Sequence, residues 1–167
     1  MYFQVNERVG DYGEETSYQG PPLGAAVLAL PAGVVAAAIA ALEALAFVLT
    51  AIAAAYLLHR ALEKAKSMGI GVAWAEEKFT IAFNWVITQA KRGIKALRDA
   101  IDKAGKQNLP PNCQNFVQIL VQQLQRLEGL LARPDFANKA AWLEELKSAI
   151  DAARRILDAF INECLKA

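Results

Sequence analysis

The stretch PLGAAVLALPAGVVAAAIAALEALAFVLTAIAAAYLL, residues 22–58, contains 37 residues and one charge, Glu43. A surface helix of a soluble protein normally has a polar face, and this stretch has almost none. Alanine supplies 15 of the 35 residues from 24 to 58, so most of its side chains are small. A run of this length and composition belongs either in lipid or in the centre of a helical bundle.

The boundaries of a helix can be placed on this run. Pro31 suits the first turn of a helix better than its interior. We therefore expect a helix over about 32–67, within an apolar unit of residues 24–67, and a short apolar lead-in over 22–30. The glycine pair in Gly69–Gly71 is typical of a helix end followed by a turn.

The rest of the chain predicts three amphipathic helices. Apolar residues recur every three or four positions over 72–106, where the second half of the helix is basic, and again in two stripes within 112–167. Asn112 is a good N-cap for the third helix, and the last helix starts near Asn138. The short connection between the two stripes of 112–167 predicts an antiparallel helical hairpin. No strand-like alternation is visible, so the predicted fold class is all-α.

Charge is distributed unevenly along the chain. Residues 1–23, read as an irregular acidic arm, have four acids and one base, whereas residues 59–167 have 17 bases and 12 acids. A change of sign across an apolar segment is typical of an oriented membrane protein, with the basic side in the cytoplasm. A single span would put the N-terminus outside and the C-terminal region in the cytoplasm; secretion before insertion is the alternative. The first residues are polar, and no signal peptide is expected there.

The balance of insertion energy is close. Residues 34–58 contain 11 strongly apolar side chains, which contribute about −3 to −7 kcal/mol on an insertion scale, and a central acid costs roughly 2.5–3.5 kcal/mol. The sum favours insertion only marginally. Three interpretations follow: a membrane span, a buried helix of a soluble bundle, and a helix that is first packed in a soluble bundle and later exposed to lipid.

Several residues form a candidate membrane or pore site. In a bilayer Glu43 would line a water path or pair between subunits, and otherwise it is simply solvated. Aromatic and basic side chains near the helix ends are expected at the headgroup level; these are Tyr56, His59, Arg60, Trp74 and Trp85. A basic surface for anionic lipid is expected at Lys91, Arg92, Lys95 and Arg98, with an ordinary solvated helix face as the alternative.

The two cysteines leave two interpretations open. Cys113 and Cys164 both lie on the apolar stripes of the predicted hairpin, where they form either a disulfide or two core thiols. If Leu131 faces Asn138, Cys113 is about seven residues, or roughly 10 Å, from the level of Cys164. That separation is beyond the reach of a disulfide, so this register favours two thiols.

Enzyme chemistry is not expected. The chain has one histidine, His59, and three serines, and none lies in a nucleophile motif. No phosphate-binding glycine loop and no cluster with metal-ligand spacing is visible. We therefore expect no catalytic residue, no cofactor, no metal, no small-molecule substrate and no nucleic-acid partner.

The favoured hypothesis is a non-enzymatic, membrane-active helical protein that forms pores or permeabilises lipid, with the membrane and a homo-oligomer or other proteins as its partners. In layout alone the chain resembles membrane-acting toxin domains secreted by bacteria. The first alternative is a small structural or assembly subunit of a membrane complex. The second is a soluble helical-bundle adaptor.

Overall fold

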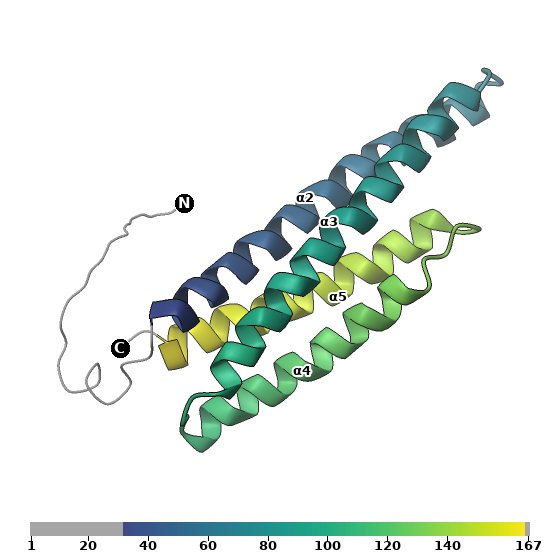
Figure 1. Cartoon of the computed structure of the whole chain (residues 1–167). Helices are drawn as coiled ribbons and strands as arrows, with labels where there is room; N and C mark the ends of the chain where they lie inside the picture. Colours follow the sequence, from purple (N-terminus) through teal and green to yellow (C-terminus); the bar gives the residue numbers. More distant parts are fainter. Residues whose placement is uncertain (1–31, 166–167) are drawn as a thin grey trace.

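The computed structural model describes residues 32–165, which form an all-α bundle (Figure 1). The fold-class prediction is therefore confirmed, and no strand occurs within that range. The expected arm over 1–23 and the lead-in over 22–30 lie outside it. The elements in chain order are α2 (Ala32–Ser67), α3 (Ala73–Gly105), α4 (Pro111–Ala132), α5 (Lys139–Phe160) and a π-helical turn (Ile161–Leu165).

The two longest helices, α2 and α3, pack side by side along their length (Figure 1). The turn between them follows the prediction from the glycine pair. Gly69 has a φ of 71°, a left-handed conformation that favours glycine. Its N–H donates to the Lys66 carbonyl at 3.1 Å and the Ile70 N–H donates to the Ala65 carbonyl at 3.0 Å, which satisfies carbonyls at the end of α2.

Close approach of α2 and α3 depends on Gly93, which is buried in the middle of α3. A Cβ atom at this position would lie 3.2 Å from Val48 Cγ2 and 3.5 Å from Leu45 Cδ2, both on α2. Ala41 and Ala51, one turn from these residues on α2, are fully buried as well. Small residues on both helices therefore bring the two backbones together, and dispersion contacts follow from that approach.

The second pair, α4 and α5, lies along most of the α2–α3 pair, and the end with the turn between α2 and α3 extends beyond it (Figure 1). α5 contacts α2, and α4 contacts α3. The predicted N-cap at Asn112 was wrong: α4 begins at Pro111, and its N-cap is Pro110. Proline suits the first helical position because it has no N–H to leave unpaired. At α5, Asn138 is the N-cap and accepts a hydrogen bond from the Ala141 N–H at 3.2 Å.

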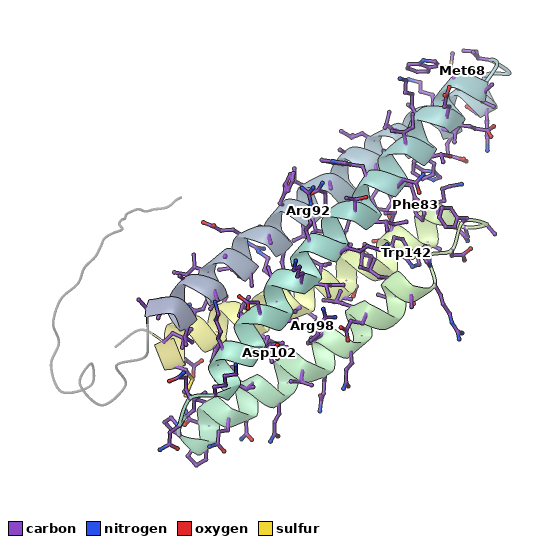
Figure 2. The ribbon with its side chains drawn as sticks, in the orientation of Figure 1. Met68, Phe83, Arg92, Arg98, Asp102 and Trp142 are labelled. Carbon is purple, nitrogen blue, oxygen red and sulfur yellow. A yellow bond between two sulfur atoms is a disulfide. The ribbon has the colours of Figure 1, made fainter. Side chains whose placement is uncertain are left out.

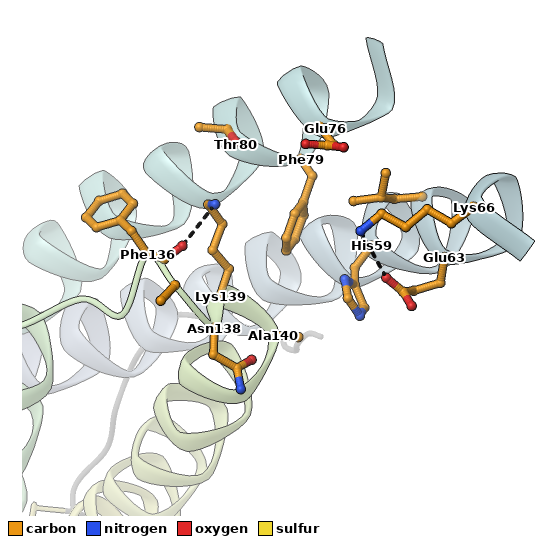
Figure 3. A pocket seen from close by; sticks show the side chains of 12 residues that line it. His59, Glu63, Lys66, Glu76, Phe79, Thr80, Phe136, Asn138, Lys139 and Ala140 are labelled. Carbon is orange, nitrogen blue, oxygen red and sulfur yellow. Dashed lines mark hydrogen bonds and ion pairs between the residues drawn. The ribbon is translucent and has the colours of Figure 1, made fainter. Parts of the chain in front are cut away.

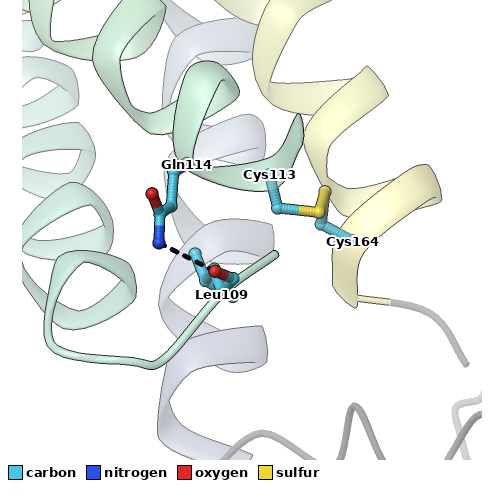
Figure 4. The surroundings of a disulfide bond; sticks show 4 residues. All are labelled: Leu109, Cys113, Gln114 and Cys164. Atoms are coloured by element: carbon cyan, nitrogen blue, oxygen red, sulfur yellow. Dashed lines mark hydrogen bonds between the residues drawn. A yellow bond between two sulfur atoms is a disulfide. The ribbon is translucent and has the colours of Figure 1, made fainter. Parts of the chain in front are cut away.

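A disulfide joins Cys113 on α4 to Cys164 in the π-helical turn, with the two Cα atoms 5.9 Å apart (Figure 4). The register that favoured two thiols placed Leu131 across from Asn138, and it was wrong. Trp142 Nε1 donates to the Leu130 carbonyl at 3.1 Å, so Trp142 and not Asn138 lies near this level of α4. At the other end, the rings of Phe116 and Phe160 lie 6.1 Å apart, in the register that brings the two sulfur atoms together.

Reduction of the disulfide should destabilise the fold. The bridge closes a separation of 51 residues, and its loss is expected to lower the free energy of unfolding by about 2–4 kcal/mol. Urea unfolding followed by circular dichroism, with and without a phosphine reductant, measures this change. A Cys113→Ala/Cys164→Ala variant controls for effects of the reductant, and should unfold at the same urea concentration in both conditions.

Enlarging Gly93 should force α2 and α3 apart. Gly93→Leu is expected to cost about 1–3 kcal/mol, because the new side chain overlaps Val48 and Leu45. Gly129 on α4 is the matched control, since a Cβ there meets nothing within 4 Å. Gly129→Leu should stabilise the protein by about 0.5–1 kcal/mol through helix propensity. Equal thermal stability of the two variants would contradict the close α2–α3 contact.

Candidate membrane-facing surface

One side of α2 faces solvent although its residues are mostly apolar. We call these exposed residues the outer strip of α2. They lie on the side away from the buried positions that pack against α3 and α5. The outer strip consists of Ala36, Ile39, Ala40, Glu43, Phe47, Thr50, Ala53, Ala54 and Leu57.

The outer strip presents large apolar side chains to water. Phe47 is 44% exposed and Leu57 is 67% exposed. The Phe47 ring packs edge-on against Trp85 of α3, with ring centroids 5.7 Å apart, and Trp85 is itself exposed together with its neighbour Ile81. The apolar surface therefore continues from α2 onto α3. Contiguous exposed apolar patches on soluble proteins usually mark interaction sites.

α2 is also the one helix in the range 32–165 that is long and apolar enough to cross a membrane. Its most apolar 18-residue window has a mean hydropathy of 2.3, and 33% of that window is buried. The core helix of a soluble protein meets the same criterion of length and composition. In this bundle α2 contributes ten buried residues to the core on the side that faces α3 and α5, and the outer strip lies on its other side.

The end of the α2–α3 pair carries further exposed apolar residues. Met68, Ile70 and Trp74 are all exposed around the connecting turn, and Figure 2 shows Met68 at the tip, beyond the α4–α5 pair. Lys78 Nζ lies 5.8 Å from the centre of the Trp74 ring, in a cation–π contact. Trp74 therefore lies at the tip of the pair, whereas Trp85 lies beside the outer strip.

Tyr56 has a structural role that the sequence did not predict. Its hydroxyl donates to Glu144 Oε2 on α5 at 2.6 Å and lies 3.1 Å from the Ala140 carbonyl oxygen. Burial, followed by the hydrogen bond and the negative charge of Glu144, raises the pKa of Tyr56 to about 12. The hydroxyl is thus engaged within the protein and ties α2 to α5.

His59 lies in a pocket between the end of α2, α3 and the start of α5 (Figure 3). Its ring centroid is 5.2 Å from that of Phe79, and its Nδ1 atom is buried without a hydrogen-bond partner in the structure. Glu63, Lys66 and Glu76 line the same pocket. Among the residues described, no group of three or more His, Cys, Asp or Glu side chains is placed so that it could hold a metal ion.

Arg60 and Glu43 are both exposed. Arg60 lines a groove of about 380 Å³ between α2 and α5, together with Tyr56 and Lys147. Glu43 is the single charged residue of the outer strip. Neither side chain takes part in an ion pair within residues 32–165.

The expected basic surface divides into two parts. Lys91, Arg92 and Lys95 are exposed on α3, where they are available to solvent or a ligand. Arg98 instead pairs with Glu128 of α4 and so helps to hold α3 against the second helix pair (Figure 2). Three of the four predicted residues therefore remain as a basic surface.

The sequence did not identify Ile39, Phe47, Leu57 and Ile81 as surface residues. A signal for the first three was present, because Glu43 and Thr50 are the only polar residues between 34 and 55 and lie seven positions apart. Residues separated by seven positions share a helix face. The solvent side of α2 could therefore have been placed through Glu43 and Thr50, and the apolar residues beside them would have been assigned to it.

The raised pKa of Tyr56 gives a pH-dependent prediction. The neutral phenol is the form that the fold favours, so its stabilisation is complete below pH 10 and is lost as the pH rises through about 12. The absorbance of wild type and of Tyr56→Phe is measured against pH, and the difference between the two titration curves should show one phenol that ionises near pH 12. Glu144→Gln should lower that pKa towards 10, because it removes the charge. A difference curve centred at 10 in the wild type would contradict the contact.

Comparison with protein-family models, with curated proteins and with solved structures found no match to this chain. Function is therefore inferred from the surface itself. Its distinguishing features are an apolar strip on α2 with one acid, an aromatic pair that joins α2 to α3, and three exposed bases further along α3.

Proposed function

We propose that this chain is a non-enzymatic, membrane-active helical protein that binds lipid through the outer strip of α2 and permeabilises the bilayer. The observation that carries the proposal is the exposure of Phe47 and Leu57 on a helix with enough apolar length to span a membrane. Apolar side chains already on the surface can enter lipid without prior unfolding of the bundle.

Neighbouring residues on α3 support this orientation on a membrane. Trp85 contacts Phe47 and would lie at the headgroup level, where tryptophan is enriched. The bases Lys91, Arg92 and Lys95 follow along the same helix and would lie near lipid phosphates. Anionic lipid should therefore strengthen binding, and added salt should weaken it.

The connections between the helix pairs favour a later rearrangement. The disulfide joins α4 to the turn that follows α5, so the α2–α3 pair is linked to this second pair only by the main chain between α3 and α4. Between the pairs, the side-chain hydrogen bonds of the described residues are those of Tyr56 with Glu144 and Ala140, and Arg98 with Glu128. Lys139 of α5 adds a cation–π contact with Phe83 of α3. Separation of the α2–α3 pair from an intact α4–α5 pair would also expose the apolar core that the two pairs share, so lipid must replace those contacts. Glu43 would then line a water path in an assembled pore.

The disulfide also bears on the compartment. Structural disulfides persist in oxidising environments and are rare in the cytosol. The Cys113–Cys164 bridge therefore favours secretion before membrane contact over a cytoplasmic C-terminal region. A secreted protein that folds around α2 and then binds lipid fits both the bridge and the marginal insertion energy.

A matched pair of substitutions tests the role of the outer strip. Ile39 on α2 and Ile119 on α4 are 38% and 39% exposed, so the same change to glutamate has a similar cost in water. Ile39→Glu should reduce dye leakage from anionic liposomes by roughly 10-fold or more, since a charge in lipid costs about 2.5–3.5 kcal/mol. Ile119→Glu should leave leakage near the wild-type level.

The wild-type protein decides between the proposed function and its alternatives. Leakage from liposomes that contain anionic lipid, but not from purely zwitterionic ones, would support the proposal. Tight binding without leakage would remove the permeabilising activity and favour the structural or assembly subunit. A protein that neither binds nor permeabilises liposomes would contradict the proposal as a whole and favour the soluble adaptor.

A further inference from the structure

The exposed side of α2 has the residue spacing of a coiled-coil seam. Nine exposed residues follow one another at alternating steps of four and three positions, so they keep a heptad repeat. The seam spans 28 helical rises, or about 42 Å. Its members are Ala36, Ala40, Glu43, Phe47, Thr50, Ala54, Leu57, Ala61 and Lys64.

We propose that in water this seam pairs with the same seam of a second copy of the chain, as an antiparallel two-fold dimer. The dimer covers the outer strip before the protein meets a membrane, so it adds a regulatory step to the proposed function. Only that regulatory meaning rests on the proposed function, because the dimer itself needs no membrane.

The register follows from residue size. With the two-fold axis at the level of residue 52, Phe47 lies across from the partner's Leu57, and Thr50 lies across from the partner's Ala54. Small side chains at the centre let the helices approach, and the larger Phe47 and Leu57 flank them on both sides. In this arrangement each seam residue of one helix lies across from a seam residue of the other helix, as an antiparallel coiled coil requires.

Charge selects the same register. Glu43 is the one acid on the seam, and in this arrangement it lies beside the partner's Arg60 and the partner's Lys64. A parallel pair would instead place Glu43 beside the partner's Glu43, which is unfavourable. Glu43 and Arg60 are both exposed and form no ion pair within residues 32–165, so both are available for the contact.

A second copy of the chain provides contacts for both the apolar and the charged residues of this surface. The partner provides apolar contacts for Phe47 and a cation for Glu43, whereas a bilayer would provide the first and not the second. A seam of one helix is smaller than a standard interface of about 800 Å² per partner. The dimer should therefore be moderate in strength and dissociate on dilution below roughly micromolar concentration.

Charge reversal tests the contact. Sedimentation equilibrium of the full chain without lipid should show a monomer–dimer equilibrium. Glu43→Arg and Arg60→Glu should each raise the dissociation constant about 10-fold or more, and the double variant should restore most of the affinity. Asp158→Arg on α5 is the control, since Asp158 is exposed outside the seam and its reversal should change nothing. Circular dichroism would verify that each variant keeps its helical content.

Crosslinking tests the orientation. In the antiparallel register, residue 53 of each copy lies within about 3 Å of the other along the helix axis, whereas the two copies of residue 40 lie about 36 Å apart. A short bis-maleimide should therefore join chains that carry Ala53→Cys and leave chains that carry Ala40→Cys as monomers. Equal crosslinking at both positions would indicate a parallel pair and overturn the register.

The dimer and the proposed function can fail separately. A wild-type chain that stays monomeric at every concentration, or a dimer that both charge reversals leave unchanged, would overturn the inference. Leakage of liposomes by such a protein would leave the proposed function intact. Conversely, a dimer that responds to charge reversal but never permeabilises liposomes would support the inference and contradict the proposed function.

Discussion

When a helix is apolar around its whole circumference, contacts on one side leave apolar surface in water on the other side. α2 has this character, and the bundle covers it with α3 and α5 while leaving the outer strip in water. Most other features of the structure depend on this constraint. It explains why the aromatic side chains Phe47 and Trp85 meet at the surface, and why the outer strip has a single charge, Glu43.

The inner side of α2 shows how such a helix can still be held firmly. Gly93 has no side chain to hold α3 away from Leu45 and Val48, so these two buried side chains of α2 pack directly against the α3 backbone. Two polar contacts join the helix pairs: the Tyr56 hydroxyl of α2 with α5, and the Arg98–Glu128 pair between α3 and α4. The two helix pairs thus form one bundle, although the disulfide lies within one pair only.

Sequence periodicity was sufficient for the helices but not for their contacts. The end of α2 at Ser67, the left-handed Gly69 and the cap at Asn138 all follow from local preferences of single residues. The disulfide could not be predicted, because the register of α4 against α5 depends on Trp142 and on the Phe116–Phe160 contact, which local patterns do not contain. For α2, composition predicted a location either in lipid or in a protein core. Which of its residues are buried and which are exposed depends on the positions of α3 and α5, and the sequence of α2 does not contain them.

Exposure of the outer strip determines what the apolar helix can do without unfolding. Had α2 been central, lipid contact would have required opening the bundle first, at the cost of the buried contacts around Leu45 and Val48. Because Phe47 and Leu57 are already at the surface, the first contact with a partner only has to displace the water that covers them, which is favourable for apolar side chains. Glu43 then distinguishes the partners, since an acid within an apolar strip is better satisfied by a cation on a protein than by hydrocarbon. In the proposed dimer, Glu43 therefore favours the protein contact in water, and a bilayer would have to supply enough apolar contact to displace it.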